Sequence, residues 1–112
     1  MMVIIDSGMG NLLSIKNIIK RVGGEAVISG DPVEIERANK IILPGVGAFD
    51  TGMTNLKSRN LIEVLNYKVK NQKIPILGVC LGMQLLTMRS DEGKLPGLGF
   101  IDAETIKFPS GS

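Results

Sequence analysis

Short apolar runs alternate along this chain with longer segments in which apolar residues recur every three or four positions. A short run without polar interruption is typical of a parallel strand that is covered on both faces. Such runs predict four strands, over residues 3–5, 25–29, 40–43 and 74–79. A further strand is expected within residues 100–108, where apolar and polar side chains alternate from Thr105 onward.

The segments with helical spacing predict helices between these strands. From Leu12 the apolar residues follow the helical period as far as Val22, where a Gly-Gly pair ends the helix. Asp31 before Pro32 is typical of a helix N-cap followed by proline in the first turn. The other predicted helices cover residues 33–38, 50–57, 61–71 and 81–88. The lysines within residues 68–73 are expected at a solvated helix end.

Strands that alternate with helices predict an α/β protein built from right-handed βαβ units. We therefore expect a flavodoxin-like parallel sheet flanked by helices. Ligand sites in such sheets lie at the carboxyl ends of the strands, so the loops after the first, third and fourth strands should meet in one crevice. Residues 109–112 have a loop composition and no element follows them, which predicts a sheet that is incomplete at its C-terminal side.

The composition argues against several kinds of partner. A formal charge of +2, from 13 basic and 11 acidic residues, is too small to favour a nucleic acid or an anionic membrane. The N-terminus resembles a first strand rather than a signal peptide, and no segment approaches the roughly 18 apolar residues of a membrane span. One cysteine and no histidine leave no disulfide framework and no credible metal cluster. We expect a cytoplasmic protein.

The one cysteine, Cys80, follows an apolar strand and precedes an apolar helix, between Gly78 and Gly82. The pattern Gly-x-Cys-x-Gly is the thiol form of a nucleophile elbow, in which the glycines permit a sharp turn and close packing of helix on strand. A helix N-terminus at this point favours a thiolate and stabilises a developing oxyanion. The alternative is a structural thiol buried in the sheet. Gln84, one helical turn on, and a nearby glycine-rich loop make us favour the nucleophile.

That loop is the segment Pro-Gly-Val-Gly at residues 44–47, directly after the third predicted strand. An N–H group from this loop, with the N–H of Leu81 after the cysteine, is suited to an oxyanion hole for a tetrahedral acyl intermediate. Taken alone, the loop is better explained by a plain turn between a strand and a helix.

Three segments, residues 6–12, 43–49 and 77–86, together resemble the class I glutamine amidotransferases. Within that family they look most like the glutaminase subunit of imidazole glycerol phosphate synthase, and the similarity extends to residues 90–93 and 97–100. The resemblance implies hydrolysis of L-glutamine through a thioester on Cys80, without a cofactor. It also implies delivery of ammonia to a (β/α)8 cyclase or synthase subunit (HisF-like), with histidine biosynthesis as the favoured pathway.

The resemblance assigns roles to individual residues. Oxyanion-hole N–H groups are expected from Val46, Gly47 and Leu81, after a reorientation of the 44–47 loop. Substrate binding is expected from Gly47 together with Gln84 and Glu92, the last two holding the α-amino and α-carboxylate ends of glutamine.

The first motif is assigned by the same resemblance to the interface with the partner subunit. Gly10 and Asn11 would lie there, close to the passage for ammonia. From the residues alone, Asn11 most simply caps the helix that begins near Leu12. Ser7 departs from the family, in which an aromatic residue is usual at this position.

The catalytic machinery of the family is incomplete in this chain. A Cys-His-Glu triad performs the family's chemistry, its histidine and glutamate lie late in the chain, and this sequence contains no histidine. We interpret residues 1–112 as the N-terminal part of a single glutamine amidotransferase domain. Because general acid–base help is worth about 10²–10⁴-fold, we predict negligible glutaminase turnover by the chain acting alone.

Three other functions are compatible with these residues. One is a paralogous ammonia supplier for the amidation of surface-polysaccharide sugars. Another is a non-catalytic, glutaminase-like binding module, which the absence of histidine favours. The third is a redox or glyoxalase-type protein with an elbow cysteine, against which the residues after Cys80 and the 44–47 loop argue.

Overall fold

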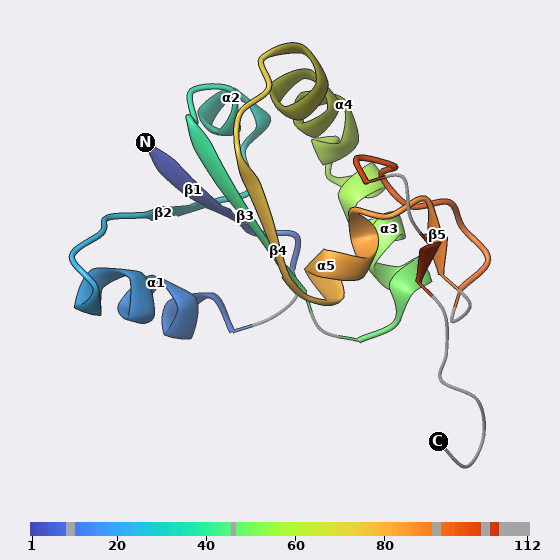
Figure 1. Ribbon diagram of the computed structural model, residues 1–112, viewed down its shortest axis with the longest axis horizontal. Helices are drawn as coiled ribbons and strands as arrows, with labels where there is room; N and C mark the ends of the chain where they lie inside the picture. The colour runs from blue at the N-terminus through green and yellow to red at the C-terminus, as the bar shows by residue number, and fades with distance from the viewer. Residues whose placement is uncertain (9–10, 46, 91–92, 102–103, 106–112) are drawn as a thin grey trace.

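The computed structural model describes residues 1–8, 11–45, 47–90, 93–101 and 104–105. Its centre is a four-stranded parallel sheet with the strand order β2-β1-β3-β4 (Figure 1). A flavodoxin-like sheet begins with the same order, so the predicted fold class is confirmed. Within the described residues, no strand pairs with the outer edge of β4. The strands are β1 (Met2–Ile5), β2 (Val27–Ser29), β3 (Lys40–Gly45) and β4 (Ile76–Cys80).

Helices fill the connections between strands near the predicted positions. Gly23 ends the first helix in a left-handed conformation with φ +87°. Asp31 caps the second helix, accepting a hydrogen bond from the N–H of Val33 at 3.0 Å. The helices are α1 (Leu12–Arg21), α2 (Pro32–Ile35), α3 (Phe49–Ser58), α4 (Leu61–Asn66), the π-helix η1 (Tyr67–Asn71) and α5 (Leu81–Leu85).

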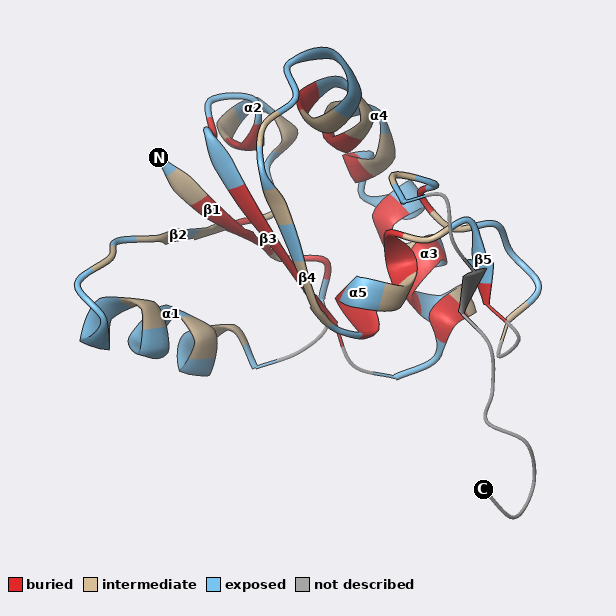
Figure 2. Cartoon of the chain, viewed as in Figure 1, coloured by how far each residue is buried: buried red, intermediate tan, exposed pale blue. Residues whose placement is uncertain are grey.

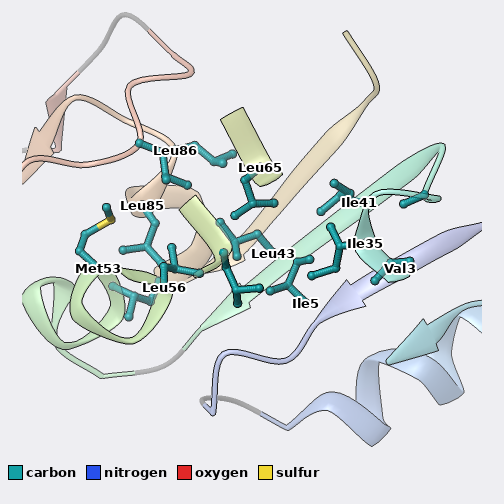
Figure 3. Packing of buried hydrophobic residues seen from close by; sticks show 14 of the residues in the cluster. Val3, Ile5, Ile35, Ile41, Leu43, Met53, Leu56, Leu65, Leu85 and Leu86 are labelled. Carbon is teal, nitrogen blue, oxygen red and sulfur yellow. The ribbon is translucent and has the colours of Figure 1, made fainter. Parts of the chain in front are cut away.

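The hydrophobic core lies on one face of the sheet (Figures 2 and 3). Alternate residues of a strand point to the same face, and the core face carries Val3 and Ile5 of β1 with Ile41 and Leu43 of β3. Helices α2 to α5 cover these side chains with apolar residues of their own. The largest of the fully buried ones are Ile35, Phe49, Leu56, Leu61, Leu65 and Leu85.

α1 lies apart from this core and from the helices that cover it (Figure 1). It has no buried residue, and Ile18 and Val22 are 60% and 80% exposed. The apolar stripe that predicted this helix therefore faces solvent over much of its width. None of the helices in the described part of the chain is both long and apolar enough to cross a membrane.

The helix predicted over residues 61–71 is regular only as far as Asn66. It continues as the wider π-helix η1, in which the N–H of Gln72 donates to the carbonyl of Tyr67 at 3.0 Å. Lys68, expected at a solvated end, is only 3% exposed. Its Nζ donates to the carbonyl of Glu36 and to Oε1 of Gln72, both at 2.6 Å. The expectation for Lys68 is wrong because the end of α2, remote in sequence, provides a carbonyl acceptor for its Nζ.

The helix predicted over residues 81–88 is also shorter than expected, because α5 ends at Leu85. The N–H of Leu98 donates to the carbonyl of Leu85 at 2.8 Å, and that of Ile101 to the carbonyl of Leu86 at 3.0 Å. Residues 98–101 therefore donate to the carbonyls of Leu85 and Leu86, which would accept bonds within α5 if the helix were longer.

A separate two-stranded parallel sheet follows α5. It pairs β5 (Arg89–Ser90) with β6 (Glu104–Thr105). Of the strand expected within residues 100–108, residues 104–105 form β6 and residues 100–101 are not in a strand. The remaining residues of that segment lie outside the described ones.

Candidate active site

Cys80 lies where β4 meets α5. It is the last residue of the strand and the N-cap of the helix, and its side chain is exposed. Its φ of 57° and ψ of −124° place it in a conformation that residues with a side chain rarely adopt. Such strain costs on the order of 1–3 kcal/mol and is concentrated at functional sites. The exposure of the thiol argues against the alternative of a buried structural cysteine.

The two flanking glycines allow α5 to pack directly on the sheet. A Cβ on Gly82 would overlap the carbonyl oxygen of Leu43 in β3. A Cβ on Gly78 would lie 2.6 Å from the Cα of Met83 and 2.7 Å from the carbonyl oxygen of Gly82. Any side chain at either position would push the helix away from the strands. The close packing inferred from the Gly-x-Cys-x-Gly pattern is therefore present.

The strand register brings the 44–47 loop to the cysteine. Gly45 pairs with Cys80 across β3 and β4, and a Cβ on Gly45 would lie 3.2 Å from the Cβ of Leu81. Leu81 is buried in the core, and as the first residue of α5 its N–H has no acceptor within the helix. Gly47 is exposed with φ +105°, and nothing lies within 4 Å of where its Cβ would be. Val46 lies outside the described residues.

Gln84 lies one turn after Cys80 on α5 and is partly buried. Its Oε1 accepts a hydrogen bond from the Oγ of Ser90 at 3.5 Å, and Ser90 is fully buried. Sequence reasoning assigned no role to Ser90 individually, because nothing in the spacing of Gln84 and Ser90 shows that the chain folds back onto α5. Glu92 lies outside the described residues.

The segment after β1 has a structural role in the part that the structure describes. Asn11 is the N-cap of α1, and its side chain accepts a hydrogen bond from the N–H of Ser14 at 3.3 Å. This confirms the simpler interpretation of Asn11 as a helix cap. Ser7 is fully buried, and its Oγ has no hydrogen-bond partner among the described residues. Gly10 lies outside the described residues.

Asp50 joins two segments near the site that are far apart in sequence. Its carboxylate accepts hydrogen bonds from the N–H groups of Lys94 and Leu95, each at 2.9 Å. The bond from Leu95, then the bond from Lys94, hold the pKa of Asp50 below its ordinary value. Sequence reasoning did not single out Asp50, because an acidic residue in the first turn of a helix is explained by the helix dipole alone.

A hollow of about 830 Å³ lies at the opposite end of the sheet from Cys80. It is lined by residues of α1 and by the amino ends of β1 and β2, including Met2, Lys16 and Val27. This hollow is therefore not part of the cysteine site. Among the described residues, no group of three or more His, Cys, Asp and Glu side chains is placed to hold a metal ion.

Comparison with solved structures places the fold in one class. A crystal structure of a glutamine amidotransferase aligns with a TM-score of 0.79, over 98% of this chain and 58% of that chain. The sequence identity is 21%, so this likeness concerns the fold. A parallel sheet flanked by helices is thus also the architecture of a known glutamine amidotransferase.

Sequence comparison carries the assignment further. The family model for class I glutamine amidotransferases matches residues 3–93. This chain therefore belongs to the class I glutamine amidotransferase family. The HisH 2 subunit of imidazole glycerol phosphate synthase from Methanococcus maripaludis is 60% identical over 108 residues, which are 96% of this chain and 54% of that protein.

Two bacterial relatives carry related names. The HisH 2 subunit from Pseudomonas aeruginosa is 50% identical over 96% of this chain and 54% of its own length. The HisH subunit from Symbiobacterium thermophilum is 46% identical over 97% of this chain and 51% of its own length. The chain thus spans about half the length of the curated relatives that it matches.

Proposed function

We propose that this chain carries the nucleophile half of a glutaminase that hydrolyses L-glutamine through a thioester on Cys80. One observation carries the proposal. The exposed thiol sits at a strained turn, on a helix that two glycines hold against the sheet. Backbone strain and exposure add nothing to the packing role of a structural cysteine. A nucleophile, in contrast, needs both access to substrate and a fixed position.

The proposed reaction begins when the Cys80 thiolate forms a bond to the side-chain amide carbon of glutamine. The carbonyl electron pair moves onto oxygen, where N–H groups of Leu81 and of the Val46–Gly47 segment stabilise it. Collapse breaks the C–N bond, and the nitrogen leaves as ammonia after gaining a proton. Water then hydrolyses the thioester to glutamate and restores the thiol. The position of Leu81 at the start of α5 supports this arrangement.

We assign the binding of glutamine itself to Gly47, Gln84 and Glu92. Gln84 projects from the same short helix as the nucleophile, and its contact with buried Ser90 fixes one end of the segment that contains Glu92. The carboxylate of Glu92 is the natural partner for the α-ammonium group. Gln84 then binds the other polar group of glutamine, its α-carboxylate.

The partner in this proposal is a cyclase or synthase subunit that receives the ammonia in a heterodimer, and Gly10 and Asn11 contact it. The names of the relatives, subunits of imidazole glycerol phosphate synthase, support this partner and the histidine pathway. The proposal places the protein in the cytoplasm and residues 1–112 in the N-terminal part of one domain.

A glutamine-analogue affinity label tests the glutaminase proposal directly. The chain has one cysteine, so any thiol adduct reports on Cys80. We expect 6-diazo-5-oxo-L-norleucine to label Cys80 with a rate that saturates with reagent concentration, and L-glutamine to protect against it. Iodoacetamide, which has no glutamine-like part, serves as the control reagent, and glutamine should leave its rate unchanged.

Three results decide between the candidate functions. Saturable, glutamine-protected labelling that is lost in Cys80→Ala supports the glutaminase. Oxidation by peroxide without labelling by the analogue would favour the redox class. No selective reaction of either kind would favour the binding module. Because the sequence lacks a histidine base, we also expect ammonia release from glutamine to remain negligible for the chain alone.

A further inference from the structure

The first turn of α3 holds the chain that follows the proposed glutamine-binding segment. Both carboxylate oxygens of Asp50 accept a hydrogen bond from the N–H of Lys94 at 2.9 Å, and Oδ1 accepts another from Leu95 at 2.9 Å. Helix dipole stabilisation needs no such partners, since it acts within the helix's own first turn. The carboxylate of Asp50 instead reaches a segment more than forty residues away.

The backbone of Gly93 packs so closely against the first turn of α3 that no side chain fits between them. A Cβ on Gly93 would overlap the Oδ1 atom of Asp50 and lie 2.9 Å from the Cδ1 atom of Phe49. Two independent observations therefore place residues 93–95 against α3: the hydrogen bonds of Lys94 and Leu95, and the close packing of Gly93. Gly93 is also the residue directly after Glu92 in the sequence.

The other end of the same short segment is held by the nucleophile helix. Ser90 is fully buried, and its Oγ donates to Oε1 of Gln84 on α5. The N–H of Gly93 also donates to the carbonyl of Ser90 at 3.2 Å, so these two residues are joined directly. Ser90 is thus held by α5, and Gly93 lies against α3.

We infer that Asp50 is a positioning residue for glutamine binding, acting through the backbone of residues 93–95. This inference rests on the proposed function, in which Glu92 holds the α-ammonium group. α3 begins two residues after Gly47, so Asp50 ties the segment that contains Glu92 to the helix that follows the oxyanion loop. Asp50 thereby fixes the position of residues 93–95 relative to the start of α3. Asp50 itself need not touch the substrate.

The test compares saturation curves for labelling of Cys80 by 6-diazo-5-oxo-L-norleucine. In Asp50→Ala we expect the half-saturating concentration to rise about 10-fold, because misplaced binding groups weaken the fit of the analogue. The maximal labelling rate and the rate with iodoacetamide should stay near those of the unaltered chain, because the elbow is untouched. Loss of a residue that only stabilised the fold would not raise the half-saturating concentration while leaving the maximal rate and the iodoacetamide rate unchanged.

Asp31→Ala is the matched control, since Asp31 makes the same kind of bond, to the N–H of Val33, at the start of α2. It should leave the half-saturating concentration within about twofold of the unaltered chain. Gly93→Ala, which keeps the carboxylate but forces the chain from α3, is the second variant and should act like Asp50→Ala. If circular dichroism shows that Asp50→Ala is unfolded, the half-saturating concentration of Gly93→Ala tests the positioning role instead.

The outcomes separate this inference from the function on which it rests. A folded Asp50→Ala or Gly93→Ala variant with an unchanged half-saturating concentration overturns the positioning role and leaves the glutaminase proposal intact. If the unaltered chain itself shows no saturable labelling, the proposed glutamine site falls, and the role of Asp50 toward glutamine falls with it.

Discussion

At the scale of single residues, the backbone of Cys80 is the most informative feature. A residue with a Cβ occupies φ 57° and ψ −124°, a conformation that favours glycine. The surroundings hold it there, because Gly45 pairs with Cys80 across the strands and Gly82 packs on Leu43. The elbow was predictable from the spacing of the glycines, whereas the positive φ at the cysteine itself was not.

Replacement of Cys80 by alanine and, separately, by glycine measures this strain. At ordinary helix and strand positions glycine is less stable than alanine by about 0.5–1 kcal/mol. At Cys80 we predict the reverse, with the glycine variant more stable by about 1 kcal/mol, because only alanine must hold a Cβ at positive φ. Urea denaturation gives both free energies of unfolding.

The matched control for this pair is Ser14, an exposed residue within α1. There the alanine variant should be the more stable one, as in any helix interior. If Cys80→Ala equals or exceeds Cys80→Gly in stability, the turn is not strained.

At the scale of elements, the junction of α2 with η1 depends on one buried cation. The Nζ of Lys68 donates to the last turn of α2 at Glu36 and to Gln72 beyond η1. A positive charge at a helix C-terminus is favourable, and Nζ supplies a donor to a carbonyl at the end of α2. Lys68 lies within the π-helix η1, so the widened turn is the segment from which its side chain reaches α2.

Substitution Lys68→Met should lower the free energy of unfolding by about 1–3 kcal/mol, because a partly buried carbonyl loses its donor while the apolar stem is kept. Lys57→Met, at an exposed position of α3, should change it by less than about 0.5 kcal/mol. Thermal or urea denaturation of both variants provides the measurement. Equal effects would show that the Lys68 contact contributes nothing specific.

The contact between α3 and residues 93–95 should depend on pH through Asp50. Bonds from Leu95 and Lys94 hold the pKa of Asp50 below its ordinary value of 3.8 in the folded chain. The carboxylate therefore stabilises the fold fully above that value, and this contribution is lost as the pH falls through the lower, folded pKa. We predict that the stability difference between the unaltered chain and Asp50→Asn shrinks below about pH 4. A difference that stays constant from pH 7 to pH 3 would contradict this.

At the scale of the whole molecule, the sheet face opposite the core carries a continuous apolar row. Strand register aligns Ile28, Ile4, Ile42 and Leu77 across the four strands. Ile4 and Ile42 are buried, but Leu77 at the edge strand is 59% exposed. An exposed apolar residue on an unpaired edge favours association with other chains.

We therefore predict that the chain self-associates at micromolar concentration, and that Leu77→Lys reduces this association. Sedimentation velocity measures the distribution of species. Val33→Lys adds the same charge at an exposed site on α2 and serves as the control, with no comparable effect expected. A stably folded monomer at all concentrations would overturn the prediction.

Much of this protein was determined by its sequence alone. Periodicity within a few residues predicted the alternating strands and helices and hence the parallel sheet, because local spacing decides which side chains share a face. The glycines around Cys80 predicted the elbow, and the residues of three motifs predicted the family that the comparisons confirm. Asp31 and Asn11 were recognisable as caps because a cap forms its bond within three residues.

Only the tertiary structure decided the features that depend on partners distant in the sequence. α5 ends at Leu85 because residues 97–101 occupy the carbonyls beyond it. Lys68 is buried because α2 offers it a carbonyl, and Asp50 binds a segment more than forty residues away. No local pattern contains these contacts, since each forms only when the sheet has brought separate segments together.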